Sequence, residues 1–153
     1  MRDSRGHAER LRSSLGLSAP PIAIAFPDAV PEGVEPFEGT VPAGCSFWEH
    51  AATRTFSTTA SDHALCSIGV HTHNMVEAPP TKPDELTASL QAMSGLDYFR
   101  DDEVATIPVL GRPVTHAVFG PLAGFPLDPE VVLLFAHAAQ GLVLSEAVAR
   151  VDG

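Results

Sequence analysis

Apolar residues near the start of the chain recur at the spacing of a helix. Ala8, Leu11 and Leu15 fall on one helical face, and the segment around them is polar. Ser4 can cap this helix, and Gly16 is a typical residue at which a helix ends. The pattern therefore predicts a short amphipathic helix that begins at Ser4 and stops at Gly16.

The clearest helical pattern lies in the second half of the chain. Pro83 is favoured at the first turn of a helix, and Leu86, Leu90 and Met93 follow at helical spacing. Gly95 then ends the pattern. The sequence predicts a helix from Pro83 to Gly95, preceded by a proline-containing connection over residues 77–82.

Short apolar runs predict the strands of a small sheet. The run from Pro20 to Pro27 is bounded by prolines, and a proline-rich loop with four acidic residues extends from it to residue 44. The pair Gly111-Arg112 suits the turn of a hairpin between two later runs. A final apolar run favours a central strand followed by a helix over about 138–148, although one long helix is the alternative. The later runs are 105–110, 114–122 and 131–135.

These elements predict one layered domain over residues 1–153. The fold class is α+β or α/β, with a small sheet of four to five strands packed against about three helices. A chain of 153 residues with 44% hydrophobic and 18% charged residues is long enough and apolar enough to bury a core.

The net charge indicates which classes of partner to expect, and the N-terminal segment indicates the cellular compartment. The formal charge is −10, which repels the phosphates of nucleic acids and of anionic membranes, so we expect neither as a partner. The first sixteen residues have no apolar centre of the kind that a secretory signal requires. We therefore expect a cytoplasmic protein with free thiols.

Chemistry-bearing residues are concentrated between residues 45 and 74. Both cysteines, Cys45 and Cys66, lie there, together with the only tryptophan, Trp48, and four of the seven histidines. Thiolate and imidazole are preferred ligands of zinc, iron and copper. The candidate metal ligands are Cys45, Cys66, His63, His71 and His73, and the candidate cofactor-binding residues are Cys45, Cys66 and Trp48.

Two local structures are open for this segment. If residues 46–52 form a helical turn, Cys45 lies at its start, where a thiolate is stabilised. As a helix, residues 63–73 would place His63, Cys66 and His73 on one stripe; as a strand, they would point His71 and His73 the same way. The spacing of the cysteines does not match the paired pattern of a zinc ribbon.

Several of these segments resemble the domain of unknown function 169 family of bacteria and archaea. The resemblance is carried by Pro-Pro-Ile-Ala-Ile before residue 25, by Cys45-Ser46-Phe47-Trp48 and by the run from His63 to His73. Residues 117–122 and 128–135 look like two later strands of that family. The resemblance implies no established activity, but it implies that Cys45, Cys66 and Gly69 stand at characteristic positions.

Two departures from that family pattern are visible. Ser67 follows the second cysteine, where the family commonly has proline. Family members usually continue with a further segment that contains cysteine and glycine, so we expect a chain that ends at Gly153 to lack it.

The sequence is compatible with three functions. The first is a metal or cofactor site in residues 45–74 that holds a transition metal ion, an iron–sulfur cluster shared across a homodimer, or haem. The second is a thiol-dependent redox enzyme that uses Cys45. The third is a non-enzymatic binding or assembly module in which buried cysteines are structural. A small-molecule ligand and a homodimer are compatible with these alternatives.

Overall fold

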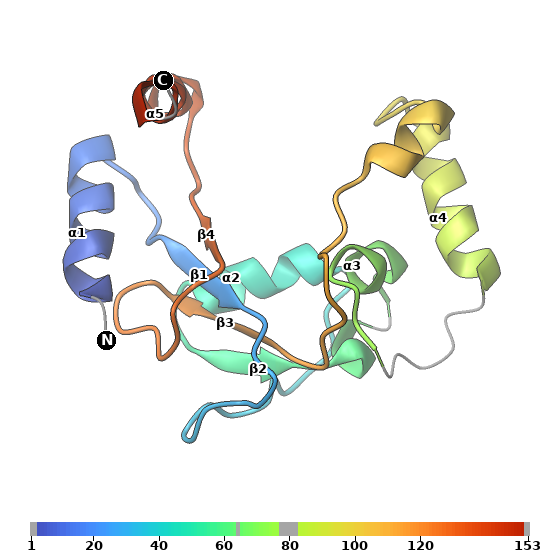
Figure 1. Cartoon of the computed structure of the whole chain (residues 1–153), viewed down its shortest axis with the longest axis horizontal. Helices are drawn as coiled ribbons and strands as arrows, with labels where there is room; N and C mark the ends of the chain where they lie inside the picture. Colours follow the sequence, from blue (N-terminus) through green and yellow to red (C-terminus); the bar gives the residue numbers. More distant parts are fainter. Residues whose placement is uncertain (1–2, 64, 77–82, 152–153) are drawn as a thin grey trace.

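The computed structural model of the chain describes residues 3–63, 65–76 and 83–151. Figure 1 shows a central sheet with helices arranged around it. In chain order the elements are α1 (Ser4–Leu15), β1 (Ile22–Ala25), η1 (Gly44–Ser46), α2 (Phe47–Ala51), β2 (Phe56–Thr58), η2 (Ala60–His63), α3 (Ser67–Thr72), α4 (Pro83–Gly95), η3 (Asp101–Thr106), β3 (Ala117–Pro121), β4 (Val131–Leu133) and α5 (Ala138–Val151), where η marks a 3₁₀ helix.

The sheet has four strands in the order β2-β3-β1-β4, and every neighbouring pair is antiparallel. Strand β1 therefore lies inside the sheet, paired with β3 on one side and with β4 on the other. An antiparallel sheet with helices outside it is an α+β fold, so the predicted fold class is confirmed. The predicted connection over 77–82 lies outside the described residues.

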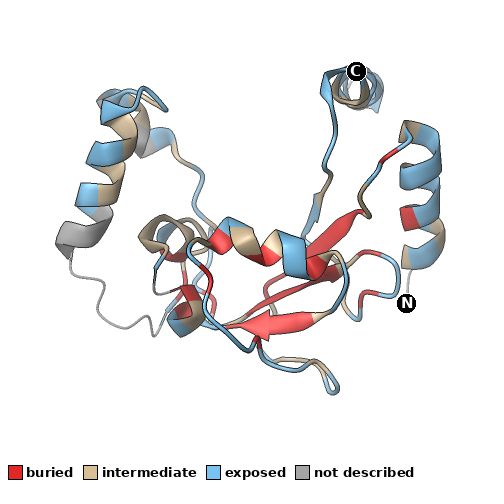
Figure 2. Ribbon diagram, turned by 180° about the vertical axis from the view of Figure 1, so that it is seen from behind, coloured by how far each residue is buried: buried red, intermediate tan, exposed pale blue. Residues whose placement is uncertain are grey.

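The alternation of large and small residues in β1 gives the sheet two different faces. Ile22 and Ile24 belong to the larger core, which includes Phe47 of α2 and the aromatic residues of β2 and β3. Ala23 and Ala25 face the other way, where Ala8 of α1 packs against them. Figure 2 shows many of the buried residues on the strands, with β4 as the exception.

Helix α1 forms where its pattern predicts it, but Asp3 rather than Ser4 caps it. The Asp3 carboxylate accepts a hydrogen bond of 2.8 Å from the backbone N–H of Gly6, and Ser4 is already helical. Gly16 ends the helix with a left-handed φ of 63°. Both residue types cap well, so the sequence alone does not separate them.

The predicted hairpin over 105–110 and 114–122 is wrong in its first half. Residues 101–106 form the 3₁₀ helix η3, and the chain then runs irregularly to Val114. The backbone N–H of Leu110 donates to the carbonyl of Thr72 instead of pairing with β3. Strand β3 has β1 and β2 as its neighbours, so no side of it is open to a hairpin partner.

The last apolar run is a strand followed by a helix, as predicted, and the alternative of one long helix is wrong. β4 pairs with β1 over three residues, and α5 begins at Ala138. Before β4, the Glu130 carboxylate accepts from the backbone N–H of Phe26 at 2.9 Å and from Arg112 at 2.8 Å. These bonds hold the start of β4 beside the end of β1. Within the described ranges, no helix has the length and apolar character needed to cross a membrane.

Candidate thiol and imidazole site

A tight turn after β2 brings His63 and Cys66 to the same side of the backbone. The N–H of Cys66 donates to the carbonyl of His63 at 2.8 Å, and Cys66 then becomes the residue that precedes α3. The segment is therefore helical from Ser67 to Thr72, and the strand interpretation of residues 63–73 is wrong. His63 itself belongs to η2, so the predicted stripe does not lie on one continuous helix.

Two glycines let the backbone approach the thiol and the imidazole closely. A Cβ placed on Gly69 would lie 3.0 Å from Cys66 Sγ and 3.5 Å from His63 Nδ1. A Cβ placed on Gly44 would lie 3.2 Å from the same nitrogen and 3.6 Å from the same sulfur. The sulfur and the nitrogen therefore lie beside the same two glycines, where a side chain on either glycine would be crowded.

Backbone conformation does not require glycine at Gly69. Its φ is outside the left-handed region, and it lies inside α3, where glycine costs about 1 kcal/mol relative to alanine. Glycine is tolerated here because a Cβ would crowd the side chains of Cys66 and His63. We call this group of four residues the thiol hollow: Gly44, His63, Cys66 and Gly69.

The hydrogen bonds of His63 define which ring nitrogen is bare. The Thr58 hydroxyl donates to the carbonyl of Ala117 at 3.4 Å, and Thr58 Oγ1 also lies 3.0 Å from His63 Nε2. A hydroxyl has one proton, so when that proton points to Ala117 the ring donates from Nε2 in the second contact. The other nitrogen, Nδ1, then carries a lone pair, and it is buried without a hydrogen-bond partner among the described residues.

Burial keeps this ring neutral. His63 is 1% exposed and contacts the Phe47 ring at 4.8 Å between centroids. Desolvation and, to a lesser extent, the neighbouring His73 lower the pKa of His63 from 6.5 to about 4, against an opposing effect of Asp62. At neutral pH the Nδ1 lone pair is therefore available to an acceptor of electron density, such as a metal ion.

His73 provides a second unpaired nitrogen close by. Its ring meets that of His63 edge-on at 5.6 Å between centroids and that of Phe26 at 5.2 Å. Burial lowers the pKa of His73, and its Nδ1 also has no partner among the described residues. The end of α3 thus adds a neutral imidazole next to the thiol hollow.

The other predicted site residues lie outside the hollow. Cys45 follows Gly44 directly but its side chain is exposed, and it forms no disulfide with Cys66. His71 is exposed on α3, while Trp48 packs on the larger core and meets Phe135 edge-on. No group of three or more His, Cys, Asp or Glu side chains is arranged for a metal ion within the described part of the chain.

Two residues of the site were not predicted as functional. Thr58 fixes the imidazole and Gly44 forms a wall, yet neither stands in a pattern that marks a ligand. A threonine that ends a strand and a glycine that follows Pro-Ala are both ordinary in a loop-rich segment. Only the fold brings them to within contact of His63.

Comparison with known proteins extends over nearly the whole chain but assigns no activity. The model of a family described as uncharacterised ArCR, DUF169, matches residues 10–153. No curated protein and no solved structure matches the chain.

Proposed function

The chain belongs to the DUF169 family, and we propose that it binds a soft transition metal ion, alone or within a cofactor, through Cys66 Sγ and His63 Nδ1. The observation that carries the proposal is that the buried Nδ1 of His63 has no hydrogen-bond partner among the described residues and lies beside the same two glycines as the thiol. A buried polar atom without a partner is costly and rare in native proteins, and it needs an explanation. A bound metal ion is an explanation that also gives a role to the adjacent sulfur of Cys66.

Thiolate and imidazole together favour copper(I), zinc or iron over magnesium or calcium. The hydrogen bond between Nε2 and Thr58 orients the ring, as hydrogen bonds to the other ring nitrogen orient the histidine ligands of metal sites. Cys66 would lose its proton on binding, because a thiol binds such an ion as thiolate. Two protein donors leave further positions for His73 or for an external ligand, which suits an exchangeable ion or a cofactor more than a closed structural zinc site.

A thiol enzyme is the second candidate, and the low pKa of His63 argues against it. A general base must have a pKa near the operating pH to take a proton from a thiol efficiently. His63, with its pKa lowered to about 4, is a weak base toward a thiol. A neutral nitrogen that resists protonation is better suited to donate to a metal.

The test is an anaerobic titration of reduced, chelator-treated protein with copper(I) and with zinc(II), each in competition with a chromophoric chelator. We expect binding of about one ion per chain, lost in Cys66→Ser and in His63→Gln. Cys45→Ser is the matched control, because it removes an exposed thiol next to the hollow and should retain binding.

Two results would count against a metal site. Binding below about a tenth of an equivalent for both ions would remove the proposal. So would binding that persists unchanged in Cys66→Ser and His63→Gln. A Cys66→Ala variant that loses stability without losing any ligand would favour the structural role of a buried cysteine.

A further inference from the structure

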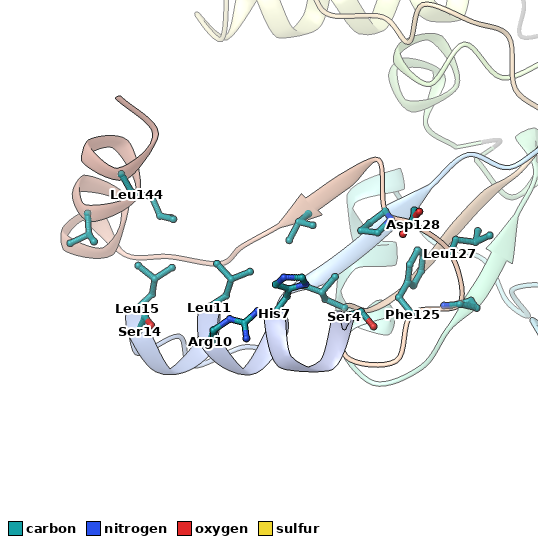
Figure 3. Close-up of a pocket in the computed structure, with 16 residues that line it drawn as sticks. Ser4, His7, Arg10, Leu11, Ser14, Leu15, Phe125, Leu127, Asp128 and Leu144 are labelled. Atoms are coloured by element: carbon teal, nitrogen blue, oxygen red, sulfur yellow. The ribbon is translucent and has the colours of Figure 1, made fainter. Parts of the chain in front are cut away.

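A large cleft lies on the opposite face of the sheet from the thiol hollow. It has a volume of about 990 Å³ and separates α1 from α5, with residues 122–132 between them. Figure 3 shows His7, Leu11 and Leu15 rising from α1 into the cleft and Leu144 extending from α5 toward them. Binding pockets for small molecules measure about 300–1,000 Å³, so the cleft can hold a whole ligand.

Apolar residues of α1 and of α5 line this cleft on two sides. Val143, Leu144 and Ala147 share one face of α5 and line the cleft, yet none of the side chains of α5 described by the structure is buried. Helix α5 is tied to α1 by Gln140, whose Nε2 donates to the carbonyls of Leu15 and Gly16 at 2.8 and 2.9 Å. Helix α5 is thus fixed at one end, and its apolar face lines the cleft without being buried.

The wall formed by α1 carries positive charge in an otherwise acidic chain. The helix has Arg5, Arg10 and Arg12 against Glu9, whereas the whole chain has a formal charge of −10. Arg10 lines the cleft beside His7, and it forms no ion pair with any residue that the structure describes. Asp128 is the acidic residue of the lining, and it follows the floor residues Phe125 and Leu127 at the other side of the cleft.

We propose that this cleft binds a soluble amphipathic molecule with a hydrocarbon body and one anionic head group. The hydrocarbon lies between Leu11, Val132 and Leu144, where it covers apolar surface that is otherwise partly exposed to water. The anionic head lies at Arg10, which gives an oxyanion a charge-assisted hydrogen bond. Asp128 disfavours the reverse orientation. This site is independent of the metal proposed in the thiol hollow.

The test is calorimetric titration of the full chain with decanoate and, as an uncharged match, with 1-decanol, both as monomers. We expect saturable binding of one decanoate per chain. Arg10→Ala should weaken decanoate by about tenfold and leave 1-decanol unchanged, because it removes the partner of the head group alone. Arg5→Ala is the control, since Arg5 is on the same helix but does not line the cleft.

Leu144→Asp provides a second variant that does not endanger folding, because α5 contributes no buried side chain. It should abolish binding of both compounds. The proposal is overturned if decanoate does not saturate, if Arg5→Ala and Arg10→Ala weaken it equally, or if Leu144→Asp has no effect. Light scattering that shows a dimer, converted to monomers by Leu144→Asp, would assign the cleft to a second copy of the chain and also overturn it.

Discussion

Replacement of His63 by glutamine should change how the stability of the metal-free protein depends on pH. Burial lowers the pKa of His63 in the folded chain from 6.5 to about 4. Above pH 6.5 the residue is neutral in both states and adds no pH dependence. As the pH falls from 6.5 to about 4, the unfolded chain takes up a proton that the folded chain does not hold, so the free energy of unfolding decreases. At about 1.4 kcal/mol per pKa unit the full loss is about 3 kcal/mol, reached near pH 4.

The assay is urea unfolding in chelator-containing buffer at several pH values between 7.5 and about 4.5. Glutamine does not titrate, so the free energy of unfolding of His63→Gln should fall less steeply with decreasing pH than that of the wild type. The difference in slope corresponds to at most one proton taken up on unfolding. Part of the slope will persist, because burial also lowers the pKa of His73. His71→Gln removes an exposed imidazole from α3 and should keep the wild-type slope. Parallel curves for His63→Gln and the wild type would refute a neutral, desolvated His63.

Three further substitutions test the packing that holds the site. Phe47→Ala should cost about 3–5 kcal/mol in urea unfolding, since the ring is fully buried against the larger core; a loss below about 1 kcal/mol would contradict this packing. Gly120→Ala should cost about 1–3 kcal/mol, because a Cβ there would overlap the Thr55 side chain and lie 3.1 Å from its Cα; an unchanged melting temperature would show that β2 can shift. Arg112→Ala should cost only about 1 kcal/mol or less, because its ion pair with Glu130 is about two-fifths exposed, and the loss should shrink in high salt.

Local patterns predicted the elements whose boundaries are set by their own residues. The helix that ends at Gly95 and the strand between Pro20 and Pro27 are defined by proline, glycine and a short apolar run, and the structure places both there. The hairpin prediction failed because a turn signal such as Gly111-Arg112 says nothing about which strand is already paired. Strand β3 finds its partners far away in the sequence, in β1 and β2.

The site was predicted only as a cluster of residue types. Spacing alone indicated that Cys66 and His63 could meet, and the structure does bring them to one hollow. Neither Gly44 nor Thr58 could be predicted from the sequence, because their roles depend on contacts in space. Gly44 lies close to Cys66 Sγ and His63 Nδ1, and Thr58 contacts the other ring nitrogen of His63. Exposure of Cys45 and His71 likewise depends on which side of a short helical turn faces the core.

The measurement closest to the central claim is a long-range ¹H–¹⁵N spectrum of the histidine rings at neutral pH, before and after addition of copper(I). We expect His63 as the Nε2–H tautomer with an imine-type Nδ1, still neutral at pH 5.5, and an Nδ1 signal that shifts when the ion binds in the wild type but not in Cys66→Ser. A His63 ring that carries its proton on Nδ1, or that is already charged at pH 5.5, would contradict a lone pair facing the thiol.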